Sequence, residues 1–190
     1  SKGEYRLFTG NEVGVLLLDY IAQVRILKHT MPKNPIAVKT IVTTDMADEV
    51  AKEYGIEIIN TLTGFKFIGE QIGILESKKE EERYIFGFEE SYGYLSGSYV
   101  RDKDAVDASM LIIEMASYYL EKGMTLVDKL QELYERFGYY QNHLLDFAFE
   151  GAKGMEEMEA IMKNLRENPP AAIGTSKLIG RSDYGTSLKI

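Results

Sequence analysis

The first 137 residues are predicted to form an α/β fold in which helices cover a largely parallel or mixed sheet. Three observations lead to this prediction. Short β-branched segments alternate with segments whose apolar residues recur at helical spacing. Gly55 and Gly123 follow two of the predicted helices, where a left-handed residue commonly ends a helix. The composition, 45% hydrophobic and 27% charged, is that of a soluble globular protein.

The elements of the first half are assigned from capping signals and residue type. Thr9-Gly10-Asn11-Glu12 has the Ser/Thr-x-x-Glu form of a capping box and precedes an apolar run, so a helix is predicted to begin there. The two predicted strands are short and β-branched. The predicted elements are a helix from Thr9 to Ile26, a strand over 36–42, a helix over 45–54, a strand over 56–59 and a helix over 65–75.

The second half continues the alternation as far as residue 137 and then changes character. The predicted elements are a charged loop over 77–83, a strand over 84–88, a glycine-containing loop, a helix over 104–120 and a helix opening at 125–128. The helix over 104–120 is amphipathic, with apolar residues at Val106, Met110, Ile113 and Ala116 or Ser117. Beyond Tyr139 the sequence predicts an extended stretch over 140–149, a helix over 155–165 ended by Pro169-Pro170, and one more strand with a turn at 183–185.

Composition narrows the class of protein. The chain has no cysteine, which excludes disulfides, zinc-thiolate sites and cysteine nucleophiles. The formal net charge of −8 argues against a nucleic-acid partner, because phosphate binding usually needs a basic face. No apolar run approaches the roughly 20 residues needed to span a bilayer, and the N-terminus has no signal-peptide pattern. A cytoplasmic protein with neither a membrane nor a nucleic-acid partner is therefore expected.

Several familiar chemistries are also disfavoured. His29 and His143 lie far apart in sequence, which makes a two-histidine metal site improbable. The Gly-x4-Gly spacing of residues 64–69 is followed by Glu70-Gln71, where a phosphate loop requires Lys and Ser or Thr. Ser91 lacks the preceding glycine of a nucleophile elbow, so a serine hydrolase is not indicated.

The most informative segment follows the predicted strand over 84–88. It reads Gly87-Phe88-Glu89-Glu90-Ser91-Tyr92-Gly93-Tyr94 and places two carboxylates and a hydroxyl at the carboxyl end of a strand. Ligands of open α/β sheets bind at that edge, and a carboxylate there can accept hydrogen bonds from neighbouring sugar hydroxyls. A solvated acidic turn is the alternative, and composition alone favours it.

This segment resembles the sugar-specificity loop of the α-D-phosphohexomutases, whose Gly-Glu-x-Ser pattern corresponds to residues 88–91. The form with an aromatic residue before the two glutamates, followed by Tyr-Gly-Tyr, is similar to the bacterial α-phosphoglucomutase and phosphopentomutase branch. Further similarity covers nearly the whole chain in the family's order. The similar segments are 9–14, 39–43, 61–69, 100–105, where Ala105 replaces the usual glycine, and 166–170.

The resemblance implies a fold and an organisation. The expected fold class is α/β, a three-layer α/β/α arrangement with a mixed four-stranded sheet, followed by a partial α+β segment. Residues 1–8 would be the tail of a preceding domain and 9–137 the sugar-binding domain, the family's third. Residues 138–190 would be a linker and the incomplete start of the C-terminal phosphate-binding domain.

The resemblance also implies roles for residues at matching positions. Glu89 and Ser91 would hydrogen-bond the O3 and O4 hydroxyls of glucose. Thr63 and Gly64 would contact the bound sugar phosphate through a hydroxyl and a backbone N–H. Lys103 would contribute positive charge near the ligand, with a surface lysine as the alternative. None of these residues is expected to be a catalytic or metal-binding group.

Three neighbouring positions have less direct roles. Arg101 is included among the substrate-binding residues, with a simple ion pair to Asp102 or Asp104 as the alternative. Phe88 stands where the family has glycine. Glu90 is expected to face away from the ligand, as an ordinary loop carboxylate.

The family moves a phosphoryl group between O1 and O6 of a hexose through a phosphoserine and a bisphosphate intermediate that turns around in the site. Its serine loop, its magnesium loop and its C-terminal arginine loop have no counterpart in these 190 residues. The full-length phosphoglucomutase is therefore expected to use Mg²⁺ and a glucose 1,6-bisphosphate activator, neither bound by this fragment. Electrostatic stabilisation dominates phosphoryl transfer, so this chain alone is expected to be inactive. Its expected partners are the hexose phosphate substrate and the remaining domains of the same polypeptide.

Two alternatives stay open. The parent enzyme could act on pentose or mannose phosphates, although the mannose branch usually has a histidine after the serine and none follows Ser91. The chain could instead be a stand-alone, non-catalytic module that binds sugar phosphates.

Overall fold

The computed structural model describes residues 3, 5–142, 147–184 and 188–189, and the chain divides into two compact units, 1–142 and 143–190. A four-stranded sheet with the order β2-β1-β3-β4 forms the centre of the first unit. β1 pairs in parallel with β2 and β3, and β4 closes the edge antiparallel to β3. The strands are β1 (Ile36–Thr40), β2 (Glu57–Thr61), β3 (Tyr84–Phe88) and β4 (Tyr94–Leu95).

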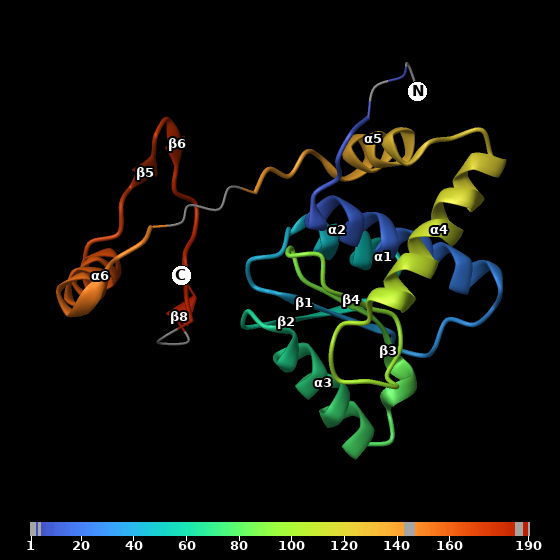
Figure 1. The fold of residues 1–190 in the computed structure, drawn as a ribbon, viewed down its shortest axis with the longest axis horizontal. Coiled ribbons are helices and arrows are strands. Elements are labelled where there is room, and N and C mark those ends of the chain that lie inside the picture. The colour runs from blue at the N-terminus through green and yellow to red at the C-terminus, as the bar shows by residue number, and fades with distance from the viewer. Residues whose placement is uncertain (1–2, 4, 143–146, 185–187, 190) are drawn as a thin grey trace. The chain divides into compact units, whose positions relative to one another are not determined.

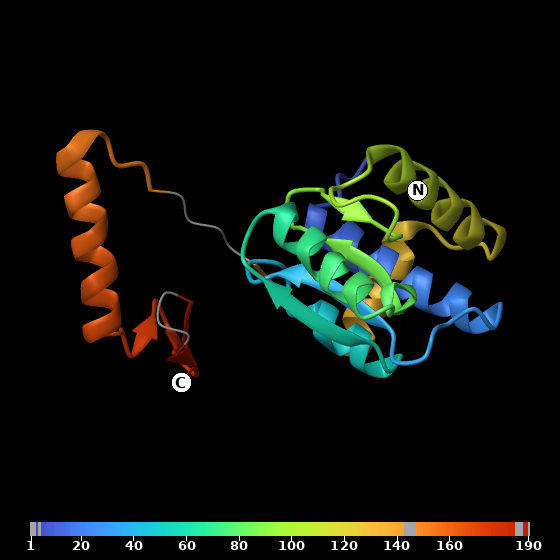
Figure 2. The same cartoon turned by 90° about the horizontal axis from the view of Figure 1, so that it is seen from below.

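Helices cover both faces of this sheet, as Figures 1 and 2 show. The helices of the first unit are α1 (Gly10–Leu27), α2 (Met46–Glu53), α3 (Phe65–Ser77), α4 (Ala105–Glu121) and α5 (Leu126–Phe137), with a 3₁₀ turn, η1 (Glu81–Arg83), before β3. α3 buries Phe65, Ile68 and Ile72 against one face, and α1, α2, α4 and α5 share the core on the other face. The predicted three-layer α/β/α fold with a mixed four-stranded sheet is confirmed.

α1 is the central helix of the larger core. Its Thr9 capping box forms as predicted, with the Glu12 N–H donating to Thr9 Oγ1 at 3.2 Å. Residues 14–22 are all buried, and among them is the fully buried carboxylate of Asp19. Lys129 of α5, also buried, lies 3.1 Å from that carboxylate, and the Tyr54 hydroxyl donates to it at 2.7 Å. A paired charge therefore joins α1 to α2 and α5 inside the core.

The structure corrects the apparent orientation of α4. Val106, Met110 and Ile113, the apolar residues that mark this helix as amphipathic in the sequence, are exposed. The buried side of α4 carries Ala108, Met115 and Tyr119 instead. Both sides of the helix are apolar, so the helical period identified the helix correctly but did not identify the side that meets the core.

Two smaller differences concern the strands. β1 ends at Thr40, two residues before the predicted end, because the Thr43 N–H donates to the Thr40 carbonyl at 3.0 Å and starts a turn. β4 lies in a region predicted as loop. Its two residues are too few for a periodic pattern, and the Tyr94 hydroxyl, which donates to the Gly10 carbonyl at 2.9 Å, joins this strand to α1.

The second unit contains both helix and strand. Its elements are α6 (Gly151–Glu167) and two short hairpins, β5 (Ala172–Ile173) with β6 (Ser176–Lys177) and β7 (Ser182–Asp183) with β8 (Leu188–Lys189). α6 confirms the helix predicted over 155–165 and extends it at both ends. Parts of the predicted extended stretch (143–146, with His143) and of the predicted turn (Gly185) lie outside the described residues. In the described part of the chain, every helix is too short or too polar to cross a membrane.

Candidate functional site

The loop that follows β3 lies at the carboxyl ends of the parallel strands. It is a tight turn, in which the Glu89 N–H donates to the Gly93 carbonyl at 2.9 Å. Tyr92 adopts a left-handed conformation there, with φ of 65°. The loop joins β3 to the antiparallel edge strand β4. Both ends of the loop are therefore held by strands of the sheet.

Glu89 is buried, with 7% of its surface exposed. Its Oε1 accepts a hydrogen bond from the Gly64 N–H at 3.1 Å, which connects this loop to the start of α3. Three side chains converge on Gly93: a Cβ at that position would lie 2.9 Å from Glu89 Oε2 and 3.2 Å from both Lys103 Cδ and Phe65 Cδ2. Glu89, Gly64 and Lys103 therefore lie together, although 39 residues separate Gly64 from Lys103 in the sequence.

Lys103 contributes a partly exposed ammonium group to this cluster. The side chain is 53% exposed, and its Nζ lies 3.2 Å from the Asp102 carboxylate. The same Nζ lies 5.5 Å from the centre of the Phe65 ring, within the range of a cation–π contact. The Lys103 backbone N–H, together with this ammonium, holds the pKa of Asp102 below its usual range. The carbon chain of Lys103 therefore lies near Gly93 in this cluster, while its ammonium group is paired with Asp102.

One part of the expectation for Glu90 is wrong. Glu90 is not an ordinary loop carboxylate, because its Oε2 accepts hydrogen bonds from Thr40 Oγ1 at 3.1 Å and Thr43 Oγ1 at 3.5 Å. Glu90 lies in the turn that follows β3, and its carboxylate turns toward the end of β1 while that of Glu89 turns toward the start of α3. Sequence analysis did not identify this contact, although the threonines in the turn after β1 can donate hydrogen bonds to a carboxylate.

Helix α1 supports the same loop from behind, a role that the sequence did not indicate. A Cβ on Gly10 would overlap the carbonyl of Glu90 and lie 2.9 Å from the Tyr92 N. The Tyr92 hydroxyl donates to the Phe8 carbonyl at 3.0 Å. Only glycine lets the first turn of α1 approach the loop this closely.

The remaining predicted site residues are less closely associated with Glu89. Thr63 and Ser91 are exposed, one next to Gly64 and the other in the turn after Glu89. Arg101 pairs with Glu76 of α3 and not with Asp102 or Asp104, and its guanidinium also donates to the Ser98 carbonyl at 2.6 Å. The alternative predicted for Arg101, an ion pair with Asp102 or Asp104, is therefore wrong. The ion pair with Glu76 connects the loop that carries Arg101 to α3.

Two further observations concern Gly64 and Phe88. The Gly64 N–H, which the resemblance assigns to the ligand, is used to hold Glu89. Phe88 is fully buried, and its ring fills the space over Gly14, where a Cβ would overlap it. The aromatic residue in place of the family's glycine is therefore part of the core and does not face the site.

A cavity of about 200 Å³ lies near the N-terminal end of α1 and not at Glu89. Among the residues lining it are Asn11, Thr44, Leu130, Tyr134 and Tyr140. Within the described ranges, His, Asp and Glu side chains form no group of three that could hold a metal ion.

Comparison with known proteins gives consistent results. Residues 9–137 match the family described as phosphoglucomutase/phosphomannomutase, alpha/beta/alpha domain III. A phosphoglucomutase of Staphylococcus aureus (strain MRSA252) is 38% identical over 187 residues, and that of strain MSSA476 is 37% identical. These alignments cover 98% of this chain and 33% of each relative, so the chain spans about a third of their length.

The fold also matches a solved structure. The open form of parafusin, a phosphoglucomutase from Paramecium, superposes with a TM-score of 0.60 at 18% identity. That match covers 97% of this chain and 31% of the other. At this identity the likeness concerns the fold.

Proposed function

The chain belongs to the phosphoglucomutase/phosphomannomutase family through its α/β/α domain III, and from this premise we propose that it is the sugar-reading part of a phosphoglucomutase. The parent enzyme would interconvert glucose 1-phosphate and glucose 6-phosphate by phosphoryl transfer through a phosphoserine. The identity of 38% to a phosphoglucomutase over nearly the whole chain supports this choice of reaction.

The buried carboxylate of Glu89 is the observation that carries the proposal. One of its oxygens accepts the Gly64 N–H, and an ionised carboxylate has about four acceptor sites in all. Acceptor capacity therefore remains for sugar hydroxyls. Burial makes such a hydrogen bond stronger than it would be in water. The solvated acidic turn, the alternative that composition favours, fits poorly with a carboxylate that is 7% exposed.

Lys103 and Ser91 would complete the sugar site. The Lys103 ammonium would attract an anionic phosphate, which matters in a chain with a net charge of −8. Ser91 and Thr63 lie in the two loops that meet through the Gly64–Glu89 hydrogen bond, and their exposed hydroxyls would bond the sugar and its phosphate. The guanidinium of Arg101, held by Glu76, would position the loop that carries Lys103.

In this proposal the site orients the substrate and does not perform the phosphoryl transfer. The hexose must be bound in two orientations, because the bisphosphate intermediate turns around between the two half-reactions. A carboxylate that accepts hydrogen bonds from O3 and O4 would hold either orientation. Such contacts contribute by holding the reactants in place.

The finer features of the parent enzyme are part of the same proposal. Residues 9–137 would form the sugar-binding domain and 138–190 the linker and start of a phosphate-binding domain. Mg²⁺ and a glucose 1,6-bisphosphate activator would act in the parent, located in the cytoplasm. The described residues do not fit a magnesium site, since no cluster of three ligands occurs among them, and the metal would be held by other parts of the parent.

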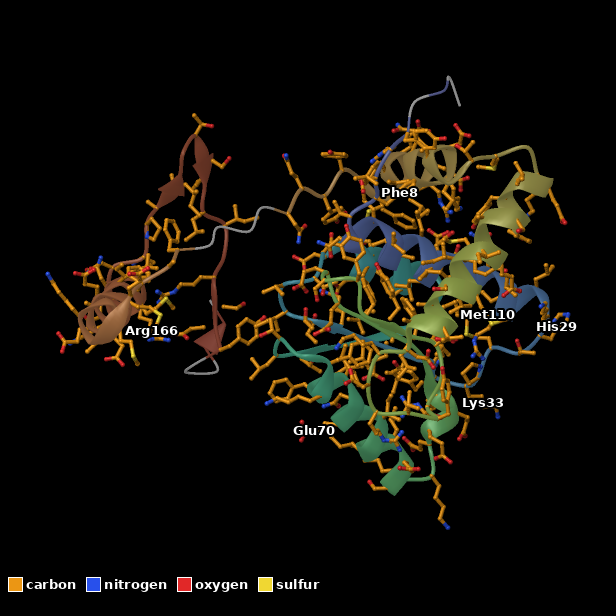
Figure 3. The ribbon with its side chains drawn as sticks, in the orientation of Figure 1. Phe8, His29, Lys33, Glu70, Met110 and Arg166 are labelled. Carbon is orange, nitrogen blue, oxygen red and sulfur yellow. The ribbon has the colours of Figure 1, made fainter. Side chains whose placement is uncertain are left out.

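Replacing Glu89 by glutamine in the intact parent tests the proposal. Glutamine keeps an acceptor for the Gly64 N–H but removes the charge. A hydrogen bond to a charged group contributes about 1.5–3 kcal/mol, so kcat/KM for glucose 1-phosphate should fall by about 10- to 100-fold. The melting temperature should stay close to that of the wild type. Glu70→Gln is the matched control, because Glu70 is an exposed residue of α3 (Figure 3) and should leave the kinetics unchanged.

Unchanged kinetics of Glu89→Gln would reject the assigned role. Glucose, mannose and pentose phosphates should be compared in the same assay, and a clear preference for either of the latter two would identify the parent as one of the alternative mutases. Calorimetry of the 190-residue chain with glucose 1,6-bisphosphate addresses the stand-alone module, which tight binding would favour.

A further inference from the structure

One side of α4 carries a row of large apolar side chains in contact with solvent. Val106, Met110, Ile113 and Leu120 are 70%, 68%, 66% and 71% exposed, and Met110 is labelled in Figure 3. With Ser117 in the fourth place, the spacing alternates between four and three residues, as in the seam of a coiled coil. The row is about 21 Å long at the rise of an α-helix. Contiguous apolar surface of this kind usually marks an interaction site.

The serines along this row do not interrupt its apolar character. The Ser117 hydroxyl donates to the Ile113 carbonyl at 2.8 Å, and the Ser109 hydroxyl donates to the Ala105 carbonyl at 2.6 Å. Both hydroxyls are thus satisfied within the helix. Ser109 and Ala116 form a flank of small residues, and small side chains at a contact let two helices approach closely.

The other flank of the row carries two glutamates and borders a groove that also contains Lys28. Glu114 and Glu121 lie seven residues apart on this side of α4. A groove of about 420 Å³ runs between α1 and α4 beside them, and Tyr20, Lys28, Glu114 and Glu121 are among the residues that line it. This surface would accommodate the edge of a helix laid along α4.

We propose that an amphipathic helix from the remainder of the parent polypeptide docks on this face of α4. Its apolar side chains would meet Val106, Met110, Ile113 and Leu120, and a basic side chain would face Glu114 and Glu121. The proposal rests on the chain being part of a longer enzyme, and the curated relatives are about three times its length. A second copy fits less well, because it would bring the same two glutamates and the same net charge of −8.

Oxidation of methionine in the intact parent protein tests this inference. Met110 and Met115 occupy the same helix, and Met115 is 1% exposed. Methionine oxidation follows exposure, so a docked helix should make Met110 react with hydrogen peroxide about tenfold or more slowly than N-acetylmethionine amide. Ile113→Lys should restore fast oxidation of Met110 while Met115 stays protected. The charge change Glu70→Lys on α3 is the matched control and should alter neither methionine.

Fast oxidation of Met110 in the wild-type parent would overturn the inference, as would protection that disappears on dilution, which would identify a second copy. The readout does not depend on activity. An active mutase with a reactive Met110 would refute only the docking surface, and a protected Met110 with an unaffected Glu89→Gln variant would refute only the proposed sugar site.

Discussion

Replacing Gly10 by alanine would place a methyl group against the loop that carries Glu89. A Cβ built at Gly10 lies 1.9 Å from the Glu90 carbonyl oxygen, and real Cβ atoms essentially never approach closer than 3.0 Å. The obstacle is backbone, so no side chain can rotate away. The loop must therefore move by about 1 Å, and overpacking of this kind costs about 1–3 kcal/mol of the free energy of unfolding.

The same displacement should affect activity in the intact parent. A misplacement of about 1 Å in a substrate-positioning group can lower the rate by about 100-fold, so kcat/KM for glucose 1-phosphate should fall by roughly that factor. Urea unfolding of the 190-residue chain, followed by near-ultraviolet circular dichroism, measures the free energy of unfolding. Of the 13 tyrosines only Tyr184 lies beyond residue 142, so this signal reports on the first unit.

Gly73→Ala provides the matched control. Gly73 lies inside α3, and a Cβ there would meet nothing within 4 Å. Alanine should stabilise the helix by about 0.5–1 kcal/mol and leave the kinetics unchanged. A Gly10→Ala variant with wild-type stability and wild-type kcat/KM would refute the inference that α1 sets the position of the loop.

Two further predictions concern the core and the response to alkali. Lys129→Met should lower the free energy of unfolding by about 3–5 kcal/mol, because it leaves the buried Asp19 carboxylate without its cation. Urea unfolding measures the change, and adding Asp19→Asn to the Lys129→Met variant should recover part of the lost stability. A loss below about 1 kcal/mol would contradict the role of the pair. Burial, together with nearby carboxylates, raises the pKa of Tyr20 and Tyr134 from 10.0 to about 12. The folded state therefore keeps these protons longer, so their contribution to stability is complete below pH 10 and is lost as the pH rises through about 12. Tyr20→Phe and Tyr134→Phe should each flatten the fall of the urea midpoint between those pH values, and an unchanged slope in both variants would contradict the assignment.

Local sequence signals were sufficient for most of the secondary structure. The capping box at Thr9 and the β-branched run before Thr40 depend on residues within a few positions of each other, and both elements formed, although β1 ends two residues before its predicted end. The charged residues before Tyr84 predicted a loop at that point of the chain. The alternation of helices with strands predicted the layers of the fold. β4 escaped notice because a two-residue strand has no period of its own and exists only through pairing with β3.

The candidate site shows where local reasoning stops. Glu89 and Glu90 are adjacent and chemically identical, and only the resemblance to the family gave them different expected roles. The fold gives them different partners, since the Glu89 carboxylate reaches Gly64 and the Glu90 carboxylate reaches Thr40. The partner of Arg101 was missed for the same reason, because Glu76 becomes its neighbour only when α3 lies against the loop.

By itself, the sequence determined the α/β class, the position of most elements and the resemblance that pointed to the loop after β3, since these depend on periodicity, caps and a contiguous motif. Only the tertiary structure decided which carboxylate is buried beside Lys103, how closely α1 approaches that loop at Gly10, and which apolar side of α4 faces the core. The physical reason is that each of these depends on contacts between residues far apart in the chain. Such contacts are selected by packing and hydrogen bonding in three dimensions, and they leave no periodic trace along the sequence.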